Sequence, residues 1–228
     1  MSVPVVTIDG PSGAGKGTVA RLLAGRVGWH LLDSGALYRL VALGGEHAGL
    51  HPDDEPGHAR LAQAMRVRFT TAAGGGEQVE LDGRDVTRAL RTETTGAGAS
   101  RVARWPAVRT ALLDRQRGFA EPPGLVADGR DMGSVIFPAA PLKVFLTASA
   151  TERAQRRHKQ LKEKGVTVNL ADLSREIGLR DRQDASRAAS PLVAAPDAVH
   201  IDSTARGVAE IVDEVWRLGA ARGLWSAG

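Results

Sequence analysis

The sequence contains no cysteine, and this absence excludes disulfides and metal sites built from thiolates. A cysteine-free chain fits a reducing compartment. No apolar run approaches the roughly 20 residues that a membrane-spanning helix needs, and the chain does not open with a charged segment followed by an apolar one. We therefore expect a cytoplasmic protein with no membrane partner.

Aromatic residues make up only 4% of the 228 residues, and no basic stretch is rich in them. Proteins that bind single-stranded nucleic acid use such aromatics to stack the bases, so we expect no nucleic-acid partner. The net charge of +4 still permits a nucleic-acid-binding module, which a DNA titration at physiological salt would test.

Lysine is scarce as well, so arginine carries most of the positive charge. The planar guanidinium group suits bidentate contacts with phosphate, although a bias in the base composition of the source genome would produce the same excess. The hydrophobic fraction of 43% is ordinary for a globular protein, and the length fits one domain with insertions.

Residues 10–18 read GPSGAGKGT, and they lie between the apolar run 3–9 and a segment with helical spacing that ends at Gly28. A glycine-rich turn between strand and helix lets several backbone N–H groups converge on one anion. The pattern predicts a phosphate-binding loop, in which Lys16 faces solvent and reaches the outer phosphates of a nucleoside triphosphate. An ordinary glycine-rich turn is the alternative.

The loop departs from the usual pattern at Gly17, where a Ser or Thr normally ligates Mg²⁺. Thr18 follows one position later, rotated by about 100° around the helix, so it does not simply replace the missing ligand. We expect Mg²⁺ to be held mainly by the phosphates and by water, with no metal ligand from the protein. This GKGT variant resembles that of nucleoside monophosphate kinases rather than that of GTP-binding switches.

Short apolar runs recur along the chain, and helix-like segments separate most of them. They occupy residues 29–32, 125–127, 142–146 and 198–201. Alternating strands and helices predict a parallel sheet with helices on both faces. The interval 34–124 is too long for one crossover, so it must hold an insertion.

Two runs inside this interval alternate in polarity, residues 67–70 and 79–81, and they flank the glycines 74–76. With the turn signal Asp82-Gly83 they predict a small antiparallel hairpin unit. A second insertion-like stretch, residues 151–165, is dense in arginine and lysine.

Polar residues follow the second and third predicted strands, in the segments 32–39 and 127–133. Because ligands bind beyond the carboxyl ends of parallel strands, these segments predict one crevice shared with the phosphate loop. A late segment carries a stripe at helical spacing: Leu173, Ile177, Arg180, Asp184 and Arg187. The stripe predicts an arginine clamp for a second phosphate, and a solvated face of local ion pairs is the alternative.

We expect the histidines and tryptophans to have structural roles and not to bind ligands. His47, His51 and His58 hint at zinc, but the intervening Gly49 and Pro52 argue against a regular helix that would align them. We expect the tryptophans to pack and not to stack on bases.

Several motifs together resemble bacterial cytidylate kinase along nearly the whole chain: IDGPSGAGKGT, WHLLDSGALYR, LVADGRDMG, LKVFLTAS and RDRQDASR, with SPLV and IDST. The resemblance implies an α/β phosphate-loop nucleotide-kinase fold with a five-stranded parallel sheet flanked by helices. It also implies a monophosphate-binding insertion at about 34–105 and a lid at about 151–167, in a single domain whose core is 1–33, 106–150 and 168–228. The implied activity is ATP-dependent phosphorylation of CMP and dCMP, with Mg²⁺, by a monomer.

The resemblance also assigns roles to individual residues. Those implied to hold ATP are Gly10, Gly13, Ala14, Gly15, Lys16, Gly17, Thr18, Arg153 and Arg157. Those implied to bind the acceptor nucleotide are Ser34, Tyr38, Arg39, Ser100, Arg109, Arg130, Asp131, Arg180, Asp184 and Arg187. Within this set Ser100, Arg109 and Asp131 would read cytosine and Asp184 the ribose, while Lys16, Arg130, Arg180 and Arg187 would be catalytic. Arg156 is a further lid candidate.

Rival functions remain open at this point. A phosphate-loop kinase for UMP, AMP or shikimate would share the loop, and a panel of acceptors would separate these. A non-catalytic ATP-binding module would share it too.

Overall fold

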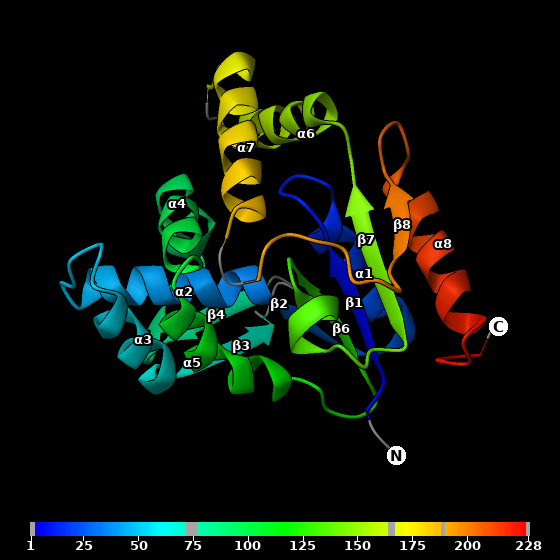
Figure 1. The fold of residues 1–228 in the computed structure, drawn as a ribbon, viewed down its shortest axis with the longest axis horizontal. Coiled ribbons are helices and arrows are strands. Elements are labelled where there is room, and N and C mark those ends of the chain that lie inside the picture. The colour runs from blue at the N-terminus through cyan, green and yellow to red at the C-terminus, as the bar shows by residue number, and fades with distance from the viewer. Residues whose placement is uncertain (1–2, 72–76, 164–166, 188–189, 227–228) are drawn as a thin grey trace. The chain divides into compact units, whose positions relative to one another are not determined.

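The computed structural model describes residues 3–71, 77–163, 167–187 and 190–226. The chain divides into two compact units, one made of Met1–Asp33 with Arg117–Gly228 and the other of Ser34–Gln116. The first holds a five-stranded sheet and the second a three-stranded sheet (Figure 1). The predicted hairpin glycines 74–76 lie outside the described residues.

The sheet of the first unit is parallel throughout, as predicted. Its strands are β1 (Val5–Asp9), β2 (His30–Asp33), β6 (Leu125–Gly129), β7 (Leu142–Thr147) and β8 (Val199–Asp202). Their order is β2-β6-β1-β7-β8. Every residue of β1 and β6 is buried, as the near-continuous apolar runs of central parallel strands require. Because the chain leaves β2 and returns in its neighbour β6, the second unit is an insertion.

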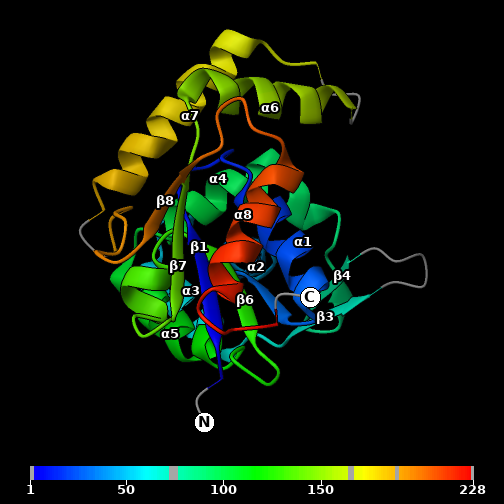
Figure 2. The ribbon, with the colours of Figure 1, turned by 90° about the vertical axis from the view of Figure 1, so that its right-hand side faces the viewer.

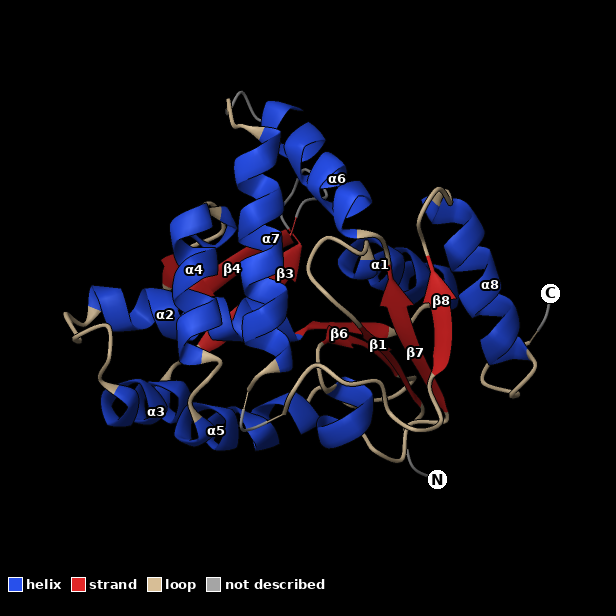
Figure 3. Cartoon of the chain, turned by 45° about the horizontal axis from the view of Figure 1, so that its top comes forward, coloured by secondary structure: helices blue, strands red, loops and turns tan. Residues whose placement is uncertain are grey.

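Helices and a short turn complete the described part of the first unit. They are α1 (Lys16–Val27), α6 (Ala150–Glu163), α7 (Leu170–Ala185), α8 (Val208–Ala220) and the π-helical turn η2 (Met132–Ile136). Helices α1 and α8 lie side by side against the sheet (Figure 2), and their apolar faces share a core with β1, β6 and β7. Helices α6 and α7 also lie side by side (Figure 3).

Trp29, Trp216 and Trp225 pack against this core, as the sequence predicts. The Trp29 and Trp225 rings meet edge to face with centroids 5.2 Å apart. The indole N–H of Trp225 donates to the Trp216 carbonyl at 3.0 Å. Gly28, with φ of 69°, ends α1 in the left-handed conformation that the sequence predicts there.

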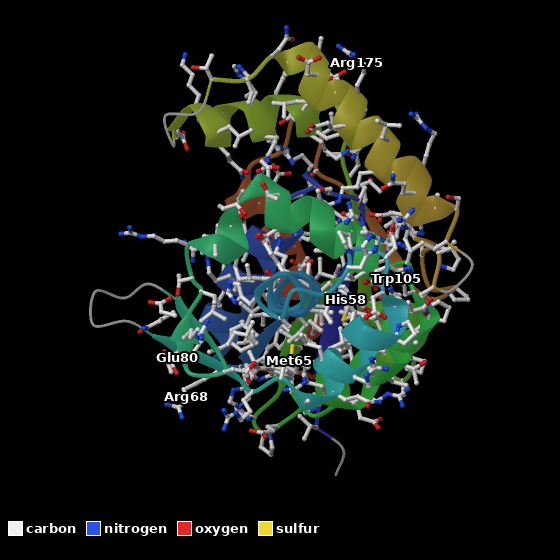
Figure 4. The ribbon with its side chains drawn as sticks, turned by 90° about the vertical axis from the view of Figure 1, so that its left-hand side faces the viewer. His58, Met65, Arg68, Glu80, Trp105 and Arg175 are labelled. Carbon is white, nitrogen blue, oxygen red and sulfur yellow. The ribbon has the colours of Figure 1, made fainter. Side chains whose placement is uncertain are left out.

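The second unit combines helices with an antiparallel sheet. Its elements are α2 (Ser34–His47), α3 (Glu55–Ala64), β3 (Val67–Thr71), β4 (Glu77–Leu81), β5 (Arg84–Asp85), η1 (Ala89–Arg91), α4 (Glu93–Val102) and α5 (Pro106–Arg117). The predicted hairpin is present as β3 and β4, where Arg68 stands opposite Glu80 (Figure 4). The turn at Asp82-Gly83 adds β5 as a third strand.

The unit extends to Gln116, beyond the boundary at 105 that we expected for the insertion. Helix α5 buries Val108 and Leu112. The backbone N–H of Ala107 also donates to Glu55 Oε1 at 3.1 Å. These contacts tie α5 to the second unit.

The histidines do not gather as a zinc site would require. His58 is buried, its Nδ1 lies 2.7 Å from the Asp54 carbonyl oxygen, and its ring packs against Trp105 with centroids 5.3 Å apart (Figure 4). Among the described residues, no three His, Cys, Asp or Glu side chains form a group that could hold a metal ion. The same ranges contain no helix long and apolar enough to cross a bilayer.

Candidate active site

The phosphate loop joins β1 to α1, and its backbone is shaped by glycine. Gly10, Gly13 and Gly15 have φ values of 148°, 79° and 94°, in the region that favours glycine. A Cβ atom on Gly10 would stand 2.0 Å from the Leu146 carbonyl oxygen, so no other residue fits. The N-cap residue of α1 is Gly15, which has no side chain to cap the helix. The N–H groups of its first turn, which lack intrahelical acceptors, therefore form an anion-binding surface.

Lys16, the first residue of α1, is buried at 6% exposure, so the expectation that it faces solvent is wrong. Its Nζ donates to the Pro11 carbonyl oxygen at 3.0 Å and lies 3.9 Å from Asp128 Oδ1. Burial lowers the pKa of Lys16 to about 8, and the positive charge of Arg130 acts in the same direction. The carboxylates of Asp128, Asp9 and Asp33 oppose this shift and keep the ammonium form favourable.

These three carboxylates stand at the ends of adjacent strands, β1, β2 and β6. Burial raises the pKa of Asp128 to about 7, against the attraction of Lys16, and raises that of Asp9 to about 6. Neither Asp9 nor Asp128 was assigned a role from the sequence. The signal was present, because both are acidic residues at the carboxyl end of a buried parallel strand, where ligands bind.

Asp128 also explains the departure at Gly17. A Cβ atom on Gly17 would lie 3.1 Å from Asp128 Oδ2, so the carboxylate occupies the space that a Ser or Thr side chain would enter. The half-buried Thr18 follows in the first turn of α1. An acidic oxygen thus stands beside the loop where the usual hydroxyl is missing.

A cluster of arginines surrounds Asp184 in the same unit. Arg130 Nε donates to Asp184 Oδ2 at 2.9 Å, and Arg187 pairs with the other carboxylate oxygen. Burial disfavours the ionised form, but the charges of Arg130, Arg187 and Arg180 prevail and hold the pKa of Asp184 below its usual value. Arg130 comes from a different element, so the cluster is more than a row of local pairs. Arg187 lies beyond the end of α7, although the sequence pattern placed it on the helix.

Asp131, next to Arg130 in the first unit, is buried, and the other predicted acceptor residues belong to the second unit. Arg39 donates to the carbonyl oxygens of Leu90 and Thr92 at 2.8 and 3.2 Å, while Ser100 Oγ donates to the Gly96 carbonyl at 3.2 Å. Arg109 is buried, donates to the Ala103 carbonyl oxygen at 3.1 Å and lies 5.5 Å from the centroid of the Tyr38 ring. Ser34, also buried, begins α2.

The arginines of α6 differ in what they contact. Arg153 makes a bidentate pair with Asp181 of α7, at 3.0 and 2.6 Å, and donates to the Ser12 carbonyl oxygen of the phosphate loop at 3.1 Å. Arg156 donates to Ser203 Oγ at 3.0 Å, and Ser203 Oγ in turn donates to the Ala14 carbonyl oxygen at 3.0 Å. Sequence reasoning missed Asp181 and Ser203, whose partners are far away in the chain.

Arg157 is half-buried and donates to Gln160 on its own helix at 3.3 Å. Its predicted contact with ATP therefore stays a prediction, as does that of Arg153.

A glycine-rich loop, a lysine at a helix start and acidic residues at the carboxyl edge of a parallel sheet define a phosphate-loop nucleotide-binding protein. A family model for cytidylate kinase matches residues 6–220. The cytidylate kinase of Azotobacter vinelandii (strain DJ / ATCC BAA-1303) is 57% identical over 221 residues, which cover 96% of each chain. That of Pseudomonas syringae pv. tomato (strain ATCC BAA-871 / DC3000) is 56% identical over 216 residues, 94% of each chain. The chain therefore belongs to the cytidylate kinase family.

Among solved structures, a gluconokinase from Sinorhizobium meliloti 1021 aligns with a TM-score of 0.48 at 17% identity, covering 98% of this chain and 97% of that chain. At this level of similarity the alignment does not bear on function.

Proposed function

We propose that this protein transfers the γ-phosphoryl group of ATP to CMP, and to dCMP, to form CDP and dCDP. The observation that carries the proposal is the phosphate loop with its buried Lys16, in a chain that belongs to the cytidylate kinase family over residues 6–220. ATP is a substrate here, as the phosphoryl donor.

The loop residues fit the phosphates of ATP. The uncapped first turn of α1 offers backbone N–H groups, and Gly13 and Gly15 allow the chain to curve around an anion. Lys16 lies at the start of that turn, where its ammonium group would neutralise charge on the outer phosphates. This donor set suits polyphosphate better than a neutral ligand, because it contains N–H groups and one cation.

The loop also fits a hydrated Mg²⁺. When bound with ATP, Mg²⁺ neutralises phosphate charge, and it keeps several of its waters. The Asp128 carboxylate occupies the space beside Gly17, so it would hold such a water in place of the usual hydroxyl. The protein then contributes an acceptor for the hydrated ion and no direct ligand.

The acceptor nucleotide is assigned to residues on both units. On the first unit Arg130, Arg180 and Arg187, gathered around Asp184, would bind the acceptor phosphate, and Asp184 itself would bind the ribose. On the second unit the residues assigned to the acceptor are Ser34, Tyr38, Arg39, Ser100 and Arg109. Ser100 and Arg109 would read cytosine together with Asp131, and we propose that the second unit is the monophosphate-binding insertion.

The chemistry requires no general base from the protein. A nucleotide monophosphate has a second pKa near 6, so at neutral pH its oxygen is already mostly ionised and nucleophilic. The protein's task is to align donor and acceptor and to neutralise the moving phosphoryl group, with Lys16 and the arginines of the Asp184 cluster. We further propose that α6, in the lid expected at about 151–167, excludes water from the site, and that the protein acts as a cytoplasmic monomer.

A coupled assay of ADP formation with CMP, dCMP, UMP and AMP as acceptors tests the proposal. We expect CMP and dCMP to be used far better than the others, because the assigned residues would pair with the cytosine edge. The Lys16→Ala variant is the control for phosphoryl transfer by this site. A protein that prefers UMP or AMP, or that forms no ADP with any acceptor, would contradict the proposed activity.

A further inference from the structure

The turn η2 follows β6, and its N-cap residue is Asp131, the residue proposed to read the base. The first backbone N–H groups of a helical turn lack intrahelical acceptors, and an aspartate at this position ordinarily accepts a hydrogen bond from one of them. The Asp131 side chain makes no such capping bond. Another group therefore has to cap the turn.

That group is Asp9, the last residue of β1. The Met132 N–H donates to Asp9 Oδ1 at 2.8 Å, and the Gly133 N–H donates to Asp9 Oδ2 at 2.8 Å. Asp9 is only 5% exposed, so both of its oxygens are committed inside the protein. A carboxylate from the central strand thus caps a turn that lies more than 120 residues later in the chain, with sequence separations of 123 and 124 residues.

The turn η2 packs closely against the sheet at Gly133. A Cβ atom on Gly133 would stand 2.7 Å from Thr7 Oγ1 and 3.2 Å from Lys143 Cδ, so the backbone of the turn lies directly on β1 and β7. The Asp131 carbonyl accepts the Val135 N–H at 2.9 Å. The backbone of Asp131 is therefore held on both sides, by the start of the turn and by the strand before it.

We propose that Asp9 is a positioning residue for base selection: by capping η2 from β1, it makes capping by Asp131 unnecessary and aims that carboxylate at the base. An Asp131 that capped its own turn would direct an oxygen at the backbone and could not present it to the cytosine amino group. The inference rests on the proposed function, in which Asp131 reads cytosine.

The Asp9→Asn variant tests the proposal, because the amide keeps the size but turns one acceptor into a donor that faces an N–H group. We expect the ratio of kcat/KM for CMP to that for UMP to fall by roughly tenfold, the scale of one lost hydrogen bond to a charged group. The charge that Asp9 contributes near Lys16 affects transfer to CMP and to UMP alike, so its loss does not change this ratio. Asp9→Ser carries the same test if the asparagine variant does not fold, since its hydroxyl can accept one of the two bonds.

Thr7→Val is the matched control. Thr7 lies on the same strand, is fully buried and contacts the same turn, but its hydroxyl has no hydrogen-bond partner among the described residues. The valine variant removes no bond, so it should keep the wild-type ratio of CMP to UMP.

The double variant Asp9→Asn with Asp131→Asn separates positioning from a merely structural role. If Asp9 acts through Asp131, the ratio of kcat/KM for CMP to that for UMP should be the same in the double variant as in Asp131→Asn alone. Equal losses for CMP and UMP in Asp9→Asn, additive losses in the double variant, or a changed ratio in Thr7→Val would each overturn the inference. A wild-type protein without preference for CMP would instead refute the proposed function.

Discussion

At the scale of single residues, Lys16 and Asp128 form the electrostatic centre of the phosphate loop. Both are buried, and the two pKa values move toward each other, Lys16 down to about 8 and Asp128 up to about 7. Lys16 is surrounded by groups whose charges depend on it, so its removal affects more than one contact.

We predict that Lys16→Ala lowers turnover by roughly 100-fold to 1,000-fold, the typical loss when one preorganised charge-stabilising group is removed. The variant should remain folded, because loss of the lysine favours protonation of Asp128 and leaves no unpaired charge at neutral pH. Steady-state kinetics and a thermal melt check this. Near-normal turnover in a folded variant would contradict the role of Lys16.

Asp128 should make stability depend on pH. Its pKa is raised on folding, so the folded state binds more protons than the unfolded state between about pH 4 and about pH 7, and stability falls as the pH rises through this window. Asp128→Asn removes the buried carboxylate. We predict that it raises the melting temperature at pH 8 by about 2–4 °C, for on the order of 1 kcal/mol, while activity falls.

The comparison requires melting curves of both proteins from pH 4 to pH 8. The advantage of Asp128→Asn should shrink toward pH 4, where the carboxyl group of the folded wild-type protein is protonated. A constant difference across this range would show that Asp128 does not titrate as described.

Asp131→Asn tests the reading of the base. Cytosine presents an amino donor beside a ring-nitrogen acceptor, and uracil presents the reverse, so a carboxylate favours cytosine. We predict that kcat/KM for CMP falls by roughly 10-fold to 150-fold, equivalent to about 1.5 to 3 kcal/mol, while that for UMP falls much less or rises. Steady-state kinetics with CMP and with UMP test this prediction. An equal decrease in kcat/KM for both nucleotides would mean that Asp131 positions the substrate and does not read the base.

At the scale of elements, α6 and α7 form a pair that Arg153 joins to the phosphate loop. Its guanidinium group bridges Asp181 and the Ser12 carbonyl oxygen, and its Cβ lies 3.1 Å from the position that a Cβ on Gly13 would occupy. These contacts connect the first turns of α6 to the phosphate loop. Most side chains of α6 are polar or charged. A change in the loop on binding ATP would therefore reach both helices.

We predict that amide hydrogen exchange in α6, which carries the basic side chains of the expected lid, slows when ATP and CMP are both bound, because phosphates relieve the repulsion among these side chains. The strands β1 and β6 are the internal control and should change little. Unchanged exchange in α6 would mean that this helix is not a lid.

At the scale of the whole molecule, the two units carry different parts of the predicted machinery. The first has the phosphate loop and the Asp184 cluster, and the second has Arg39, Ser100 and Arg109. Each unit has its own sheet. The residues assigned to the acceptor are thus distributed over both units. We therefore expect that ATP is consumed quickly only when the acceptor is bound.

We predict that ATP without CMP is hydrolysed at least about 100-fold more slowly than ATP is consumed with saturating CMP, since the proposed lid would exclude water when both nucleotides are bound. Release of ADP measured with and without CMP checks this. Comparable rates would show that water enters the site freely and that acceptor binding does not control transfer.

The sequence by itself determined the elements whose signals are local. The loop GPSGAGKGT, the C-terminus of α1 at Gly28, the five strands and the β3–β4 hairpin all follow from short patterns of glycine and apolar spacing. Local backbone preference and burial are sufficient for such predictions. The helical stripe grouped Arg180, Asp184 and Arg187, the family resemblance added Arg130, and the structure brings these residues together.

Only the tertiary structure decided the contacts between residues far apart in the chain. The burial of Lys16 among three strand ends, the Arg153–Asp181 pair and the capping of η2 by Asp9 each join segments that no spacing rule relates. The extent of the second unit to Gln116 depends on where α5 packs. These features are set by the order of strands in the sheet, because a parallel sheet places the ends of β1, β2 and β6 side by side whatever their separation in sequence.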